Sequence, residues 1–305
     1  MKWIKKGLIY NVDERIKWAT NTVSTPTPFL LSSDVIRIYA SFRDNLGRSR
    51  IGYIDVDAAN PNRILQISAN PVLDIGALGM FDDNGVILGD LIRIGNEIRM
   101  YYVGFQMVEN VKFLAYSGLA ISTDGGDSFQ RYQPTPIMDR AANALFIRAI
   151  HTIIKDGDIF KIWYAVGNGW EYIDNKPYPQ YNIRYTESKD GIHFEDNVGI
   201  LGIDVQENEY RIGRPRVIKR SENNYEMRYT FDTKNKEYIA GIAFSSNGKD
   251  WIRDDKKSGL YKSASGWDSE MACYPVEIET KYGTYLFYCG NGMGSGGIGY
   301  AQLEP

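Results

Sequence analysis

Four carboxylate side chains stand in two short segments that also hold glycine and aromatic residues. Asp82 and Asp83 occur in "GMFDDNGV", and Asp268 and Glu270 occur in "GWDSEMACYP". Acid–base cleavage of a glycosidic bond requires one protonated and one ionised carboxyl group. We therefore take Asp83 as the candidate base or nucleophile, Glu270 as the acid, and Asp82 or Asp268 as the group that tunes their pKa values.

Each of these carboxylates also has a structural interpretation. An Asp shortly before Gly, as in "DDNG", is a common turn former, and this applies to Asp82 and Asp83. Asp268 and Glu270 would, in the same interpretation, cap a loop. The sequence alone does not decide between the catalytic and the structural interpretation of these carboxylates.

The strand pattern predicts that arginines and aromatic residues gather on the same face of the protein as these segments. Arg43, Arg48, Arg148, Arg211 and Arg214 exceed what neutral sugar hydroxyls need, so a sugar that carries a carboxylate or phosphate is expected unless the carboxylates named above pair with them. Flat aromatic rings stack on sugar rings. The predicted substrate-binding residues are Arg148, His151, Glu209, Arg211, Arg214, Trp170, Trp267, Tyr274 and Asn291.

Metal and cofactor sites are not expected. The chain has only His151 and His193, and a buried structural role for His151 is the competing interpretation to a chemical one. The glycine-rich "GNGMGSGG" joins two strands and opens no helix that could hold a phosphate. Cys273 and Cys289 have no metal-site spacing, and we expect two free thiols that lie close together.

The elements that must position these residues are repeated strands. Five segments share a strand rich in aromatic residues, a loop and a second strand with small residues, for example "EIRMYYVGF…LAYSGLAIS" and "NYEMRYTFD…EYIAGIAFS". A further short strand precedes each. At about 60 residues per repeat, this predicts a single all-β domain over residues 1–305, a five-bladed β-propeller with four antiparallel strands per blade.

The fifth repeat lacks its last strand. "KWIKKGLIY" at residues 2–10 resembles "DWIRDDKKSGLYK", which follows the third strand of the fourth repeat. We therefore expect the N-terminal strand to complete the last blade, close the ring and remove an exposed edge. The alternative is a chance match within a β-sandwich.

Composition limits the partners. The formal net charge is −3, so no general attraction to nucleic acid or to an anionic membrane is expected. The first residues carry scattered charges and no apolar run of signal-peptide length, which favours a cytoplasmic location. The sequence does not determine the oligomeric state.

The segments "GMFDDNGV", "IGRPRVI", "GWDSEMACYP" and "GNGMGSGGIGYA" carry a resemblance that covers nearly the whole chain. The chain resembles the five-bladed propeller glycoside hydrolases of families 43, 32 and 68. It most closely resembles a bacterial set often encoded beside polysaccharide-biosynthesis genes. The resemblance implies a glycosidase or transglycosidase. Thr25 and Thr27 stand where those relatives usually have an Asp, which leaves a non-catalytic carbohydrate-binding propeller as the alternative and a protein-interaction platform as a third hypothesis.

Overall fold

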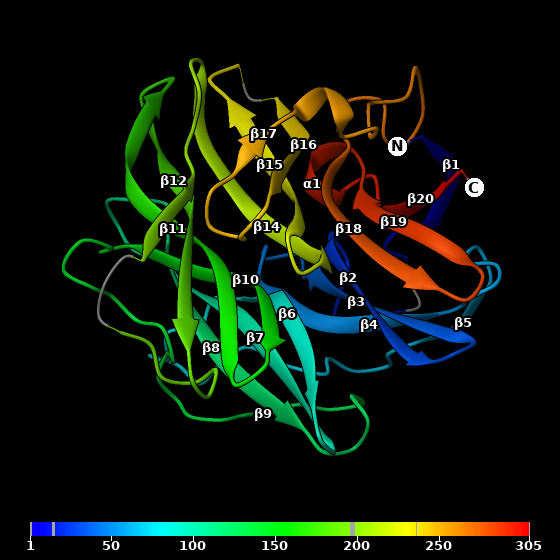
Figure 1. Ribbon diagram of the computed structural model, residues 1–305. Helices are drawn as coiled ribbons and strands as arrows, with labels where there is room; N and C mark the ends of the chain where they lie inside the picture. Colours follow the sequence, from blue (N-terminus) through cyan, green and yellow to red (C-terminus); the bar gives the residue numbers. More distant parts are fainter. Residues whose placement is uncertain (1, 14–15, 196–198, 236, 305) are drawn as a thin grey trace.

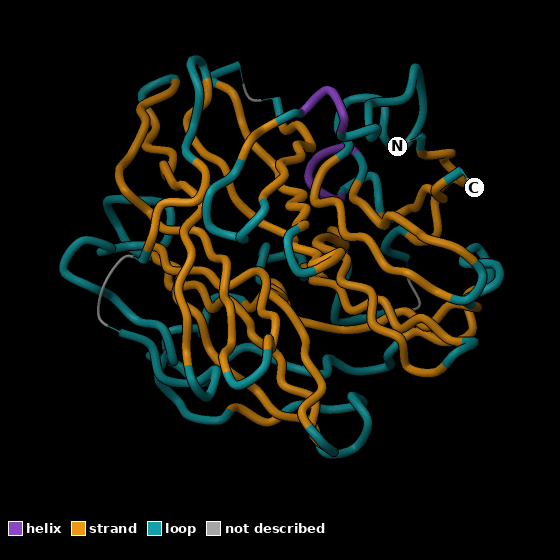
Figure 2. The backbone as a smooth tube through the Cα atoms, viewed as in Figure 1, coloured by secondary structure: helices purple, strands orange, loops and turns teal. Residues whose placement is uncertain are grey.

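Strands joined by loops make up the described chain, with almost no helix (Figures 1 and 2). The computed structural model describes residues 2–13, 16–195, 199–235 and 237–304. Its two helical segments, η1 (Asp255–Lys257) and α1 (Asn291–Gly294), are single turns, and neither has the length or hydrophobicity that crossing a bilayer requires. The predicted all-β fold class is confirmed.

Consecutive strands pair antiparallel in five groups: β2 to β5, β6 to β9, β10 to β13, β14 to β17, and β18 to β20 with β1. We call them groups 1 to 5. The strands are β1 (Trp3–Tyr10), β2 (Thr22–Ser32), β3 (Val35–Arg43), β4 (Ser49–Asp57), β5 (Ile64–Ile67), β6 (Val86–Ile94), β7 (Glu97–Gln106), β8 (Leu114–Ser122), β9 (Gln130–Arg131), β10 (Ile147–Asp156), β11 (Ile159–Ile173), β12 (Lys176–Ser188), β13 (Ile200–Ile203), β14 (Glu209–Ser221), β15 (Asn224–Thr233), β16 (Tyr238–Ser245), β17 (Ile252–Arg253), β18 (Cys273–Thr280), β19 (Gly283–Cys289) and β20 (Ile298–Leu303).

The groups are not five separate sheets. Short parallel pairings join β8 to β10 and β12 to β14, so groups 2, 3 and 4 form one twelve-stranded sheet, while groups 1 and 5 are four-stranded sheets. These pairings involve only two residues of β10 and one of β14. They arise where first strands lie close to the third strand of the preceding group.

The N-terminal strand pairs with the C-terminal strand, as the repeat pattern predicted. β1 lies antiparallel to β20, with Trp3 opposite Leu303 and Tyr10 opposite Ile298. Trp3 is buried there. The two ends of the chain therefore lie side by side (Figure 1).

The core lies between neighbouring groups. Five clusters of buried apolar side chains bridge groups 1 and 2, 2 and 3, 3 and 4, 4 and 5, and 5 and 1. The first strands β2, β6, β10, β14 and β18 contact one another in that cyclic order. This arrangement brings one strand of every group to the centre of the molecule.

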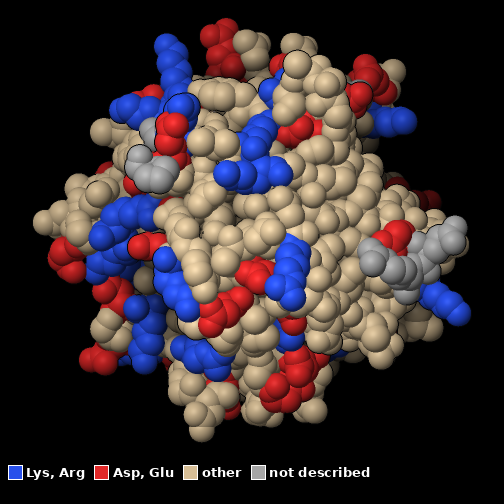
Figure 3. All heavy atoms as spheres, turned by 90° about the vertical axis from the view of Figure 1, so that its right-hand side faces the viewer, with Lys and Arg blue, Asp and Glu red and all other residues tan. Residues whose placement is uncertain are grey.

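Charged side chains of both signs are mixed on the surface. On the side shown in Figure 3, Lys and Arg side chains lie next to Asp and Glu side chains. Opposite charges of this kind form exposed ion pairs such as Lys2 with Glu304. No single-sign patch dominates this face.

Candidate functional site: a central cationic cavity

A cavity of about 460 Å³ opens at the centre of the molecule, and the first strand of every group contributes to it. Thr25, Ile87, His151, Arg214 and Tyr274 line it, one from each group. The remaining lining comes from further residues of the first strands, from second and third strands, and from the loops that join them. A cavity of this size is in the range of small-molecule sites.

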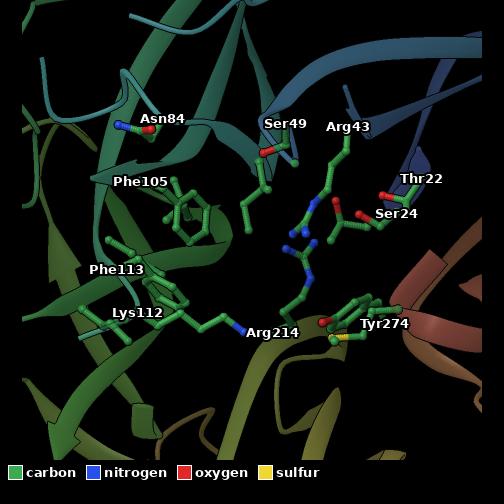
Figure 4. Close-up of a pocket in the computed structure, with 18 of the residues that line it drawn as sticks. Thr22, Ser24, Arg43, Ser49, Asn84, Phe105, Lys112, Phe113, Arg214 and Tyr274 are labelled. Atoms are coloured by element: carbon green, nitrogen blue, oxygen red, sulfur yellow. The ribbon is translucent and has the colours of Figure 1, made fainter. Parts of the chain in front are cut away.

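The cavity has an apolar wall and a polar wall. Phe105 and Phe113 lie with ring centroids 5.1 Å apart, across the cavity from Ser24 and Tyr274 (Figure 4). The rest of the apolar wall is formed by Ile87, Val103, Ala115, Ile147, Ala149 and Ala165. A ligand that fits this cavity therefore needs one apolar face and one polar or charged face.

The polar side chains are aimed into the cavity by bulges in the first strands. Thr25, Arg214 and Tyr274 each precede a proline and each have a positive φ, between 53° and 55°. The strand pairing shifts register at each of these points, and also at His151. Left-handed backbone is strained for residues other than glycine, and bulges of this kind turn side chains toward functional sites.

Five cationic side chains line the cavity, and only two of them have acidic partners. Arg211 lies 2.7 Å from Asp232 and Arg48 lies 3.1 Å from Asp44. Arg43, Lys112 and Arg214 make no ion pair with any described Asp or Glu. We call these three residues the cation triad.

The members of the cation triad face one another. Figure 4 shows the guanidinium groups of Arg43 and Arg214 meeting in the cavity, with the Lys112 side chain extended toward them. Arg214 is buried, donates one hydrogen bond of 3.1 Å to the Leu88 carbonyl, and has a second nitrogen, Nη2, without a partner. The triad is therefore an uncompensated concentration of positive charge.

Burial and neighbouring cations lower the pKa values of two members of the triad. Burial, and then the neighbouring Arg216, lower the pKa of Arg214 to about 10. Loss of solvent, and then Arg211 and Arg43, lower the pKa of Lys112. An anion bound among these groups would oppose both shifts, because it favours the protonated forms.

His151 lies at the bottom of the cavity and is buried. Burial, followed by Arg214 and Arg216, places the pKa of His151 well below its ordinary value. Its ring is therefore neutral near pH 7, and its Nδ1 has no hydrogen-bond partner. His151 can contact a ligand as a neutral polar group.

The predicted carboxylates do not line the cavity. Asp82 is fully buried and lies 2.7 Å from Arg131, in the packing between β9 and the loop after β5. Asp83 accepts hydrogen bonds from the Gly79 amide at 2.9 Å and the Asn84 side chain at 2.8 Å. Asp83 is thus placed as a turn former, one residue from Asn84, which does line the cavity.

The second carboxylate pair is also outside the lining. Asp268 is buried, lies 2.5 Å from Lys5 of β1 and accepts a 2.9 Å hydrogen bond from the hydroxyl of Tyr288 in β19, so it connects two strands of group 5. Glu270 is exposed on the loop before β18. None of the described residues that line the cavity is Asp or Glu.

The predicted binding residues divide into two sets. His151, Arg211, Arg214 and Tyr274 line the cavity. The other five have other contacts: Arg148 donates to the Asp139 carbonyl at 2.9 Å, Glu209 pairs with Arg253 at 2.8 Å, Trp170 packs on Phe146, Trp267 stacks on Tyr288, and Asn291 accepts the Glu270 amide at 2.7 Å.

Cys273 and Cys289 lie close together, as the sequence predicted. Cys273 and Cys289 are opposite each other in the β18–β19 pairing and are free and buried. Burial raises the pKa of Cys289 to about 12. Both lie beneath the cavity, where Cys289 Sγ accepts the Thr25 amide at 3.2 Å.

Several lining residues were missed by sequence reasoning. Lys112 and Phe113 lie in the loop between β7 and β8, and Phe105 lies near the end of β7. Tyr181 lies in β12, and Tyr238 begins β16. A signal was present for the central residues, because "TPTP", "GRP" and "CYP" each place a residue before proline within a first strand. No comparable signal marks Lys112.

Two mycobacterial proteins are similar to this chain over its whole length. The chain is 34% identical over 306 residues to Uncharacterized protein Rv1502 of Mycobacterium tuberculosis strain H37Rv, and 33% identical over 305 residues to Uncharacterized protein MT1551 of strain CDC 1551, with both partners covered completely in each case. The chain belongs to this Rv1502 family. No protein-family model matches it.

Solved structures of glycoside hydrolases share the fold of this Rv1502-family chain. One described as a glycoside hydrolase has a TM-score of 0.77 at 18% identity, covering 99% of this chain and 92% of that one. A thermostable family-43 glycoside hydrolase has a TM-score of 0.68 at 17% identity, covering 93% and 90%. A glycosyl hydrolase from Bacteroides ovatus has a TM-score of 0.70 at 15% identity, covering 99% and 94%. The predicted resemblance to the propeller glycoside hydrolases is therefore confirmed for the fold.

Proposed function

We propose that this chain binds an acidic carbohydrate in its central cavity. One observation carries the proposal: three cationic side chains, Arg43, Lys112 and Arg214, meet there without a described acidic partner. Of the three, Arg214 is buried, and an uncompensated buried charge destabilises a folded protein, so a ligand of opposite charge best explains its presence. This supports recognition of an anion.

The remainder of the cavity supports a sugar as the body of the ligand. Phe105 and Phe113 offer ring surfaces for the C–H face of a pyranose, while Ser24, Asn84 and Tyr274 offer groups that hydrogen-bond hydroxyls. The fold shared with glycoside hydrolases adds to this proposal. The ligand class predicted from the sequence thus stays our proposal.

Calorimetric titration with matched sugars tests the proposal. Acidic sugars, for example glucuronate and glucose 6-phosphate, should bind at least about tenfold more tightly than glucose, because one charge-assisted hydrogen bond contributes about 1.5–3 kcal/mol. Arg43→Gln should remove this preference. Lys189→Gln, an equal change of charge at an exposed residue of the turn after β12, serves as control. Equal affinities for acidic and neutral sugars would contradict the proposal.

Hydrolysis of a glycosidic bond is the second candidate function, and the glycoside hydrolase fold is the observation that favours it. In that case Asp83 and Glu270 are the carboxyl groups to test, with Asp82 or Asp268 as tuning groups. Asp83 adjoins a lining residue, and the Glu270 amide is held by Asn291, which precedes the lining residues Gly292 and Met293.

Asp83→Asn and Glu270→Gln should each abolish turnover and leave sugar binding nearly unchanged if the chain is a glycosidase. Release of reducing sugar from acidic polysaccharides measures this. If the parent protein releases none while it binds acidic sugars, the binding function stands alone.

We also propose that the five strand groups are the blades of a closed five-bladed ring. The pairing of β1 with β20 and the cyclic contacts of the first strands support it. Deletion of residues 2–10 would expose the edge of β20 and remove Trp3 and the Lys5 partner of Asp268. A large fall in melting temperature is expected, and an unchanged one would contradict closure.

A further inference from the structure

The charge of the cation triad limits which anion fits it. A sugar carboxylate carries one negative charge and offers two oxygens, which a single guanidinium can occupy fully. Two of the three cations would then have no anionic partner in a partly desolvated site. A phosphate monoester carries about −1.5 to −2 charges near pH 7 and offers three terminal oxygens.

The geometry provides one donor group for each phosphate oxygen. Arg43 and Arg214 approach from opposite sides and Lys112 from a third (Figure 4). The Arg214 Nη2 donor is buried and has no partner. Arg211 and Arg48, the other two cations of the lining, already pair with Asp232 and Asp44, so they add little net charge.

We propose that the cation triad is a phosphate site, so that the carbohydrate ligand is a phosphorylated sugar and not a uronic acid. This inference rests on the proposed function for the sugar part of the ligand. The phosphate lies between Arg43, Lys112 and Arg214, and the sugar extends toward Phe105 and Phe113, which form part of the apolar wall. Exposed Leu46 and Met107 at the cavity lining leave room for a longer ligand to continue outward.

The first experiment uses small anions alone, because the identity of the sugar is unknown. Inorganic phosphate and acetate are titrated into the full-length protein by calorimetry in a buffer without multivalent anions. Phosphate should bind at least about tenfold more tightly than acetate, since it engages three cations in place of one. Acetate that binds as tightly as phosphate, or no heat with phosphate at millimolar concentration, overturns the inference.

Variants locate the phosphate. Arg43→Gln and Lys112→Gln change exposed side chains and should fold normally, and each should weaken phosphate binding about tenfold or more. Lys189→Gln should leave it unchanged. Arg214→Gln changes folding as well as binding, because Arg214 has a strained backbone and donates to the Leu88 carbonyl. Unchanged phosphate affinity in both Arg43→Gln and Lys112→Gln overturns the assignment.

A second titration separates this inference from the proposed function. Glucose 6-phosphate that binds more tightly than both inorganic phosphate and glucuronate supports both. Glucuronate that binds more tightly than glucose 6-phosphate overturns the phosphate site and leaves the acidic-carbohydrate function standing. Inorganic phosphate that binds while acidic sugars bind no better supports the phosphate site and overturns the carbohydrate function.

Discussion

Arg214 and Arg216 lie two residues apart on β14, and both are buried, yet their surroundings are opposite. Arg216 donates to the Asp90 carboxylate at 3.0 Å, to the His151 carbonyl at 2.7 Å and to the Thr27 hydroxyl. Arg214 has one backbone acceptor and no acidic partner among the described residues. The Arg216 contacts reach β2, β6 and β10, so this arginine connects four strand groups.

The difference shows how one strand serves two purposes. The bulge at Arg214 and Pro215 turns the first arginine into the cavity and the second into the packing beneath it. A buried cation with a carboxylate partner holds the fold together, whereas a buried cation without one is available to a ligand. We therefore expect the two arginines to separate stability from binding.

The largest effect should follow from breaking the Arg216 pair. Asp90→Ala removes the carboxylate, leaves a buried guanidinium without its partner and should lower the free energy of unfolding by about 3–5 kcal/mol. Asp127→Ala is the matched control, since Asp127 pairs with Arg37 but its side chain is 64% exposed and Asp55 still pairs with Arg37. That control should lower the free energy of unfolding by less than about 1 kcal/mol. Denaturant unfolding followed by circular dichroism measures both, and equal losses would remove the distinction.

A smaller loss of stability is expected at Arg214. Arg214→Met removes one hydrogen bond to a carbonyl, which contributes about 0.5–1.5 kcal/mol, and also removes the repulsion between Arg214 and Arg216. The net change should stay below about 1.5 kcal/mol, while phosphate should no longer raise the melting temperature. If Arg214→Met destabilises as much as Asp90→Ala, then Arg214 is also a structural cross-link and the comparison fails.

The smallest effect, of opposite sign, is expected at Lys112. Its pKa in the folded protein is lowered, so its charge destabilises the fold at neutral pH, and this penalty disappears as the pH rises through the folded pKa toward the ordinary value of 10.5. Lys112→Gln should therefore raise the free energy of unfolding slightly. The increase should be about a few tenths of a kcal/mol, because the side chain is exposed. The advantage should shrink between pH 7 and pH 10. A variant less stable than the parent at pH 7 would show that the contact of the Lys112 ammonium with the Tyr178 ring, 5.7 Å from its centroid, outweighs this penalty.

The strand repeats and the pairing of the chain ends could be predicted from sequence because they rest on local patterns. Alternating apolar residues, turns with glycine and the likeness of residues 2–10 to the fourth repeat predicted antiparallel groups, and β1 does pair with β20. The prolines in "TPTP", "GRP" and "CYP" also marked where first strands depart from regular pairing. These features depend on neighbours in the chain.

The partners of the charged residues were decided by the tertiary structure. The sequence placed Asp82 and Asp268 among candidate catalysts, but the fold sets Asp82 against Arg131 and Asp268 against Lys5, 49 and 263 residues away in the chain. Whether a charge is neutralised depends on which distant side chain lies within about 4 Å, and no local pattern encodes that distance. The same physics leaves Arg43, Lys112 and Arg214 without acidic partners among the described residues, and on that arrangement we base the proposed anion site.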